Sequence, residues 1–131
     1  MSVSSFSKIR RITIPVGDES VVIIVREPSS KERSDFLTSR FEMQGRKLKN
    51  LQTQARGRFI RPLLMDIENA TYEDVAGNAQ PLNKNTTLAE ADKTYIETVL
   101  GIPVNDWRDL VNASWLSSAA MAFEDPAPEG N

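Results

Sequence analysis

A long series of apolar residues at helical spacing is the feature that most restricts the fold of this chain. Its members follow one another at steps of three, four or seven residues: Leu37, Phe41, Leu48, Leu51, Ala55, Phe59, Leu63 and Ile67. Such steps place side chains on one face of an α-helix. Gly45 weakens a helix by about 1 kcal/mol relative to alanine, and Pro62 removes a backbone donor. We therefore expect helix over residues 30–69, kinked or broken near Gly45 and Pro62, in two pieces of about 30–44 and 47–69.

A β-hairpin is expected before this helix, over residues 8–26. Residues 21–25 are an uninterrupted run of β-branched side chains, which favour the pleated surface of a sheet. Residues 8–14 supply a partner strand with two isoleucines on one face, and turn-forming residues fill the connection. Because a hairpin alone is only marginally stable, this one must pack on another element.

Serine or threonine followed three residues later by glutamate is typical of a helix start, because the two side chains satisfy free backbone N–H groups. Ser29 with Glu32 predicts the start of the first helix. Thr87 with Glu90 predicts a further helix over residues 87–100.

The last helix is expected over residues 105–123, with Asn105 as its cap. Gly101 can adopt the left-handed conformation that ends the preceding helix, and Pro103 prevents its continuation. Residues 70–85 are rich in asparagine, glycine and proline, which predicts a loop.

Together these patterns predict a mainly α fold with an N-terminal β-hairpin and about four helices. The 131 residues suit one domain with one modest core, which we place at residues 1–123. Residues 124–131 are acidic and proline-rich, and we expect them to form a disordered tail.

The charges divide the chain into a basic and an acidic half. Residues 1–61 carry 13 Lys and Arg against 6 Asp and Glu, whereas residues 62–131 carry 3 against 12. The basic residues are densest in a basic stretch that comprises Arg40, Arg46, Lys47, Lys49, Arg56, Arg58 and Arg61. Two poles of opposite sign favour head-to-tail association, which builds rings or open filaments, and they steer charged partners. The alternative interpretation is that the basic and acidic halves are only the solvated faces of one domain and mediate no association.

The chain contains no histidine and no cysteine, so the commonest general base, thiol nucleophiles and the usual zinc ligands are missing. No segment sets two carboxylates in an apolar context, which acid–base catalysis by carboxylates requires. We therefore expect a protein without enzymatic activity, metal or cofactor. The longest apolar run, residues 21–25, is far shorter than the roughly 20 residues that span a bilayer. Without cysteine or an export signal, an intracellular protein that does not bind membranes is expected.

Apolar residues near the basic stretch form a possible contact surface for amphipathic helices, because methionine and aromatic side chains suit adaptable surfaces. The candidates are Phe41, Met43, Leu48, Met65 and Trp115. Phe59 lies on the same stripe, and we assign it to the core. The basic stretch itself is expected to bind an acidic partner surface or the acidic half of a neighbouring copy.

Residues 26–33 lead from the hairpin into the first helix with the sequence Arg-Glu-Pro-Ser-Ser-Lys-Glu-Arg. A glycine-containing loop, residues 74–78, precedes two further helices and the acidic tail. This order, and residues 26–33 above all, resembles the tail assembly chaperones of long-tailed bacteriophages. The resemblance extends over most of the chain and includes no catalytic motif.

The resemblance implies a non-enzymatic assembly factor of the host cell cytoplasm that is absent from the mature virion. Such chaperones bind the tape measure protein, keep that long helical chain soluble and recruit tail tube subunits onto it. A longer form made by −1 ribosomal frameshifting is common in the family and would carry the tube-binding module. Residues 129–131 can be encoded by a slippery heptamer, which is compatible with such a form.

Two other functions remain open. The basic stretch could dock on a phosphate backbone, as in a small nucleic-acid-binding regulator. Its aromatic residues, Phe41 and Phe59, fall on the apolar stripe, which favours core packing over stacking on bases. A virion structural component, such as a head–tail connector or minor tail protein, would differ by its presence in purified particles.

Overall fold

The computed structural model describes residues 8–124, which adopt an α+β fold. Within these residues 39% are helical and 32% lie in strands, so the prediction of a mainly α fold is wrong. The helices are α1 (Ser30–Ser39), α2 (Gln52–Ile60), α3 (Glu90–Leu100) and α4 (Ala113–Met121), with two 3₁₀ helices, η1 (Arg61–Leu63) and η2 (Trp107–Leu110). The strands are β1 (Ile9–Val16), β2 (Glu19–Arg26), β3 (Phe41–Gln44), β4 (Lys47–Asn50), β5 (Leu64–Glu68), β6 (Ala70–Glu73) and β7 (Ala79–Leu82). None of the helices in this part of the chain has the length and apolar character that crossing a membrane requires.

The central sheet is antiparallel, with strand order β1-β2-β5. The pairing of β1 with β2 confirms the predicted N-terminal hairpin. β5 adds a third strand that places Ile67 opposite Ile23. Alternate residues of β2 are buried, as expected for a strand with one face on the core.

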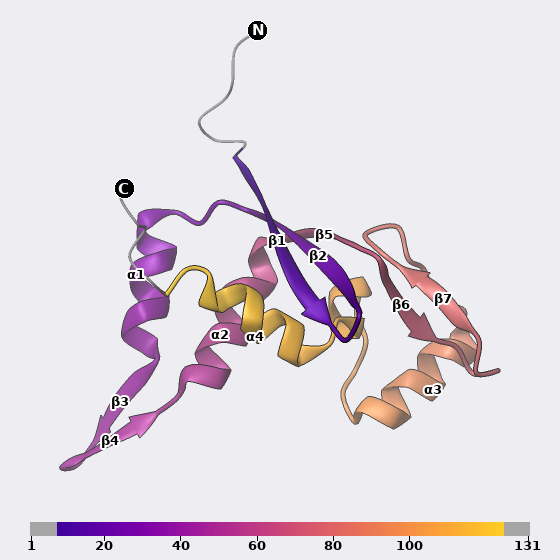
Figure 1. Cartoon of the computed structure of the whole chain (residues 1–131). Helices are drawn as coiled ribbons and strands as arrows, with labels where there is room; N and C mark the ends of the chain where they lie inside the picture. The colour runs from indigo at the N-terminus through magenta and orange to yellow at the C-terminus, as the bar shows by residue number, and fades with distance from the viewer. Residues whose placement is uncertain (1–7, 125–131) are drawn as a thin grey trace, which may run out of the picture.

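The core lies where helices α2 and α4 pack on this sheet. α4 contacts both α2 and β1, and α1 contacts α2 (Figure 1). Three aromatic rings join these helices to the chain after α4. Phe59 stacks on Phe36 with 4.2 Å between ring centroids and meets Phe123 edge-on at 5.4 Å. The assignment of Phe59 to the core is confirmed, because its side chain is buried.

The predicted helix over residues 30–69 is wrong, because a second hairpin interrupts it. α1 ends at Ser39, and β3 pairs with β4 across a turn in which Gly45 adopts a φ of 64°. This left-handed conformation suits glycine and belongs to the turn of the hairpin. The chain then forms α2, and Pro62 lies within η1, where the helix gives way to β5. The seven-residue step from Phe41 to Leu48 was interpreted as two turns of helix. In the structure these residues lie on β3 and β4, on either side of the hairpin loop.

The region predicted as a loop, residues 70–85, contains the hairpin of β6 and β7. The Asp74 carboxylate accepts hydrogen bonds from the backbone N–H groups of Ala76 and Asn78, and these bonds shape the turn. α3 begins at Glu90 after Ala89, so the predicted capping pair at Thr87 does not form. The predicted left-handed end of α3 at Gly101 is confirmed by a φ of 73°.

The single helix predicted over residues 105–123 is wrong, because two separately capped helices occupy this region. Asp106, rather than Asn105, caps η2 through its side chain. Val111 then takes an extended conformation, and Asn112 caps α4 by accepting from the Ser114 N–H at 2.8 Å. Aspartate and asparagine are good N-cap residues. Residues 105–123 therefore contain two helix starts, at Asp106 and Asn112, where we expected one.

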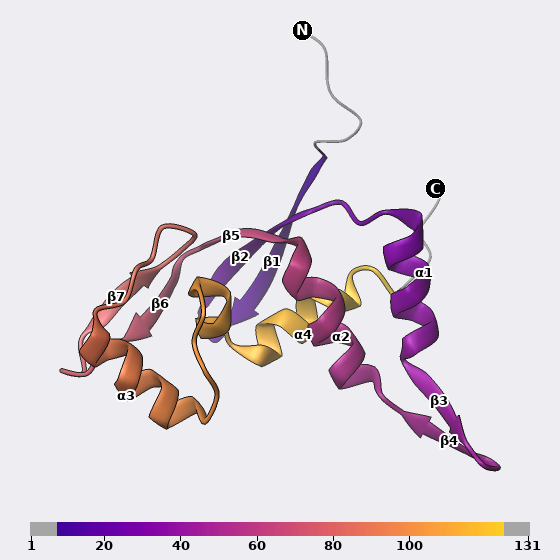
Figure 2. The same ribbon diagram turned by 180° about the vertical axis from the view of Figure 1, so that it is seen from behind.

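The molecule is elongated, with a small hairpin at each end. The hairpin of β3 and β4 projects beyond α1 and α2 at one end (Figure 1). The hairpin of β6 and β7 lies beside α3 at the opposite end, as the view from behind also shows (Figure 2). The central sheet and α4 lie between the two ends.

Candidate functional site

The projecting hairpin at residues 41–50, here called the arm, is exposed along its whole length. Met43 lies opposite Leu48 in the ladder, and each is 62% exposed. Side chains alternate between the faces of a strand, so Phe41 lies on the same face as Met43. Lys47 and Lys49 lie on the other face, next to the turn at residues 45–46. Glu42 and Gln44 lie opposite these lysines. The arm therefore presents an apolar face and a polar face with a net positive charge, and neither is used by the core.

The base of the arm is fixed by a clamp in which Arg40 and Arg56 hold Glu124. Arg40 Nη1 lies 3.0 Å from Glu124 Oε1, and Arg56 Nε lies 2.6 Å from Glu124 Oε2. The Glu124 side chain is only 11% exposed. Hydrogen bonds from Arg56 and then Arg40 lower the pKa of Glu124 below its ordinary value, despite partial burial. Glu124 was expected to begin the disordered tail, and the ordered clamp contradicts that expectation for this residue; residues 125–131 lie outside the described part of the chain.

The basic stretch divides into residues that serve the fold and residues that stay on the surface. Arg40 and Arg56 form the clamp, and Arg61 Nη2 lies 2.7 Å from Asp109 Oδ1. The remaining four are exposed and form no ion pair within residues 8–124: Arg46, Lys47, Lys49 and Arg58. Three of these four lie on the arm, so the available positive charge is concentrated there.

The five apolar candidates are only partly brought together. Phe41, Met43 and Leu48 share one face of the arm. Met65 is exposed on β5, in the central sheet, and Trp115 is half-buried on α4 against the core. The structure therefore supports a contact surface on the arm and assigns Trp115 to core packing.

Sequence analysis missed a groove at the opposite end of the molecule, between β6 and α3. It has a volume of about 320 Å³, and its lining includes Tyr72, Glu73, Tyr95, Val99 and Leu100. The composition of α3 contained the signal, because the helix has more apolar residues than its one buried position, Ile96, requires. Val99 is left 65% exposed.

Negative charge surrounds this groove, here called the acidic groove. Glu73 lines it, and Asp92 Oδ1 accepts a hydrogen bond from the Val75 N–H at 3.0 Å, which joins α3 to the β6–β7 turn. Burial, followed by the negative charges of Asp92 and Asp74, raises the pKa of Tyr72 above its ordinary value. The groove therefore combines an apolar lining with one carboxylate, Glu73, and the carboxylates of Asp92 and Asp74 act on its Tyr72.

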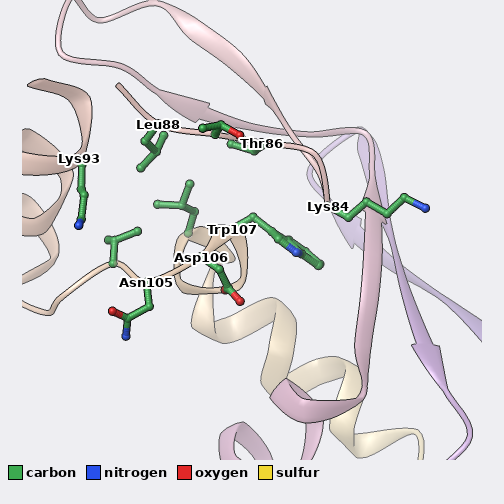
Figure 3. Close-up of a pocket in the computed structure, with 10 residues that line it drawn as sticks. Lys84, Thr86, Leu88, Lys93, Asn105, Asp106 and Trp107 are labelled. Carbon is green, nitrogen blue, oxygen red and sulfur yellow. The ribbon is translucent and has the colours of Figure 1, made fainter. Parts of the chain in front are cut away.

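A second hollow, of about 360 Å³, lies between α3, η2 and the loop before α3 (Figure 3). Trp107, Leu88 and Val104 contribute apolar surface, and Trp107 and Val104 are themselves part of the buried interior. Lys84 extends away from the hollow in Figure 3. The other polar lining residues are Thr86, Thr87, Lys93, Asn105 and Asp106. Within residues 8–124, no three acidic side chains are grouped to hold a metal ion.

The segment that carries the family resemblance, residues 26–33, acts as a structural joint between β2 and α1. Ser29 and Glu32 form the predicted capping box, which is confirmed. Arg26 binds both oxygens of Glu32, at 2.8 and 2.7 Å, and this pairing lowers the pKa of Glu32 to about 2. No protein-family model, curated protein or solved structure matches the chain.

Proposed function

We propose that this protein is a non-enzymatic assembly chaperone of the phage tail type. In this role it binds the tape measure protein, keeps that long helical chain soluble and recruits tail tube subunits. It acts in the host cytoplasm and does not remain in the virion. The sequence resemblance centred on residues 26–33 supports the proposal.

The arm is the single structural observation that supports this function most directly. Ten consecutive exposed residues form a hairpin whose apolar face contributes nothing to the core of the chain. A hairpin of two strands is marginal by itself, and exposed apolar side chains favour contact with another chain. Methionine adds adaptability to such a surface. A surface of this kind suits a protein whose task is to contact other chains during assembly.

The clamp at Glu124 is relevant to a longer, frameshifted form. Phe123 is buried, and Glu124 pairs with Arg40 immediately before β3. A module appended after the described residues would therefore leave the folded part beside the base of the arm. This exit point supports the proposal that a longer form carries its tube-binding module near the contact surface.

Co-expression with the tape measure protein encoded nearby tests the function. We expect the tape measure protein to become soluble and to co-purify with this chain. The variant Met43→Ser/Leu48→Ser should lower the soluble yield, because coating a long partner requires the contact surface of the arm. The matched control is Met65→Ser, which changes an exposed methionine of the central sheet and should leave the yield unchanged. Insoluble tape measure protein beside a folded wild-type chain would overturn the proposal.

A small nucleic-acid-binding regulator is the second candidate, and the shape of the arm favours it. The major groove of DNA admits a two-stranded β-ribbon, and the arm carries Arg46, Lys47 and Lys49. Under this function, a DNA duplex should bind with an affinity that falls steeply as salt concentration rises. The Met43→Ser/Leu48→Ser variant should then bind as wild type does, since phosphate contacts come from the basic residues.

A further inference from the structure

We propose that the arm of one copy docks in the acidic groove of a second copy, so that copies join head to tail. The inference rests on the assignment of the arm as a protein contact surface in the proposed function. It names the partner of that surface as a second copy of this chain. It does not depend on the tape measure protein.

The positions of the two surfaces determine the form of the assembly. The arm and the acidic groove lie at opposite ends of the molecule (Figures 1 and 2). The arm therefore cannot reach the groove of its own chain, and the contact joins different patches on two copies. Each added copy leaves one arm and one groove free, so the contact propagates into an open chain or closes as a ring.

The apolar parts of the two surfaces are complementary in shape, because one projects and the other is hollow. The arm offers Met43 and Leu48, two neighbouring side chains that project from a narrow hairpin. The groove offers Tyr95, Val99 and Leu100 on α3, all exposed in the isolated chain. A narrow apolar projection and an apolar hollow remove each other's surface from water when they meet.

The charges of the two surfaces have opposite signs. The arm carries Arg46, Lys47 and Lys49 and one acidic residue, Glu42, which lies opposite Lys49. The three cations form no ion pair within residues 8–124. Around the groove, Glu73 and Asp92 likewise form no ion pair within the described residues. Docking the arm therefore brings available cations to available carboxylates, which fixes the orientation and speeds the encounter.

A charge-exchange experiment on the purified chain, without tape measure protein, tests the inference. The arm variant is Arg46→Glu/Lys47→Glu/Lys49→Glu, and the groove variant is Glu73→Lys/Val99→Lys. The arm variant carries acidic residues at both surfaces, and the groove variant carries basic residues at both. Each variant alone should repel its own copies. A mixture of the two should associate, because every arm then meets a groove of opposite sign.

Sedimentation velocity over a range of protein concentrations gives the readout. Wild-type protein should form species larger than dimers as concentration rises, and added salt should reduce them. Each variant alone should raise the apparent dissociation constant at least about a hundredfold, and the equimolar mixture should restore association. The control Arg58→Glu reverses an exposed charge away from the arm and should associate as wild type does. Circular dichroism should show all variants folded, since every changed side chain is on the surface.

Two outcomes would overturn the inference: a wild-type monomer at every concentration, or no association in the mixture. Because only this chain is present, the result is separate from the proposed function. Tape measure protein kept soluble by a chain that stays monomeric would preserve the function and reject arm docking. Self-association without any effect on the tape measure protein would support arm docking and reject the proposed function.

Discussion

At the residue scale, Glu124 links two segments of the chain through one carboxylate. Its carboxylate joins Arg40 before the arm to Arg56 on α2, and both guanidinium groups are largely shielded from solvent. Glu124→Gln leaves two cations without their counter-charge, so it should lower the free energy of unfolding by about 1–3 kcal/mol. Urea unfolding followed by tryptophan fluorescence measures the change. The control Glu90→Gln alters an exposed residue and should have little effect; equal stability of both variants would contradict the role of the clamp.

Acid should destabilise the protein through Glu32 and Glu124. The pKa of Glu32 is lowered from 4.5 to about 2 by Arg26 and the Ser29 cap, and the pKa of Glu124 is lowered by Arg56 and Arg40. A lowered pKa in the folded state contributes stability above the unfolded pKa, and this contribution is lost as pH falls through the folded pKa. The unfolding free energy should therefore fall between pH 4.5 and pH 2. Urea titrations across this range should give a shallower slope for Glu32→Gln/Glu124→Gln; an unchanged slope would contradict the assignment.

Capping residues show how much sequence can predict at the residue scale. Ser29 and Glu32 form the expected box, and Arg26 reinforces it. Thr87 and Glu90 have the same spacing and form none, because α3 begins three residues later than expected. The preceding chain is held in a different turn, in which Thr86 Oγ1 accepts from the Asn83 N–H at 2.9 Å. Spacing identifies a possible cap, but contacts with the preceding chain decide whether it forms.

At the scale of elements, the end of α4 should contribute much of the stability. Phe123 is fully buried against Phe59, and the guanidinium of Arg10 lies 4.5 Å from the centre of its ring. Phe123→Ala should lower the free energy of unfolding by about 3–5 kcal/mol, because it leaves a cavity in the core. Met121→Ala changes an exposed residue two positions earlier and serves as the control in the same urea titration. A loss below about 1 kcal/mol for Phe123→Ala would show that the end of α4 is not part of the core.

The arm should open locally without unfolding the rest of the molecule. All of residues 41–50 are exposed, whereas Ile23 in β2 is fully buried between two paired strands. Regions with few buried contacts open at low free-energy cost. In the monomeric charge-reversed arm variant, amide hydrogen exchange in the arm should therefore be much faster than in β2. Equal protection of the arm and β2 would contradict this account.

The central region shows why element type was only partly predictable. The series from Leu51 to Ile67 has helical spacing, yet it spans α2, η1 and β5. Ile67 completes the helical series and also lies opposite Ile23 in the sheet. Local spacing could not distinguish these two roles, because pairing with β2 is a contact across more than forty residues of sequence. The N-terminal hairpin was predictable because its β-branched run and its turn are local signals.

At the scale of the whole molecule, the division of charge in the sequence only partly becomes a division in space. β5 belongs to the acidic half and pairs with β2 of the basic half, so the two halves interleave. Arg11 pairs with Glu68, and Arg61 pairs with Asp109, so part of each charge is neutralised internally. The charged side chains used in the inferred docking form no ion pair within residues 8–124, and they lie at the two ends, on the arm and around the acidic groove. The basic end was predictable from composition, whereas the groove required the packing of α3 on β6.

If copies join head to tail and also act in the proposed function, many copies of this chain should together coat one long helical partner. The most direct measurement is the mass, by light scattering, of purified complexes with full-length tape measure protein and with a version shortened by half. The number of copies bound per tape measure chain should exceed one and should fall in proportion to its length. A fixed ratio of one copy per tape measure chain, whatever its length, would contradict the account.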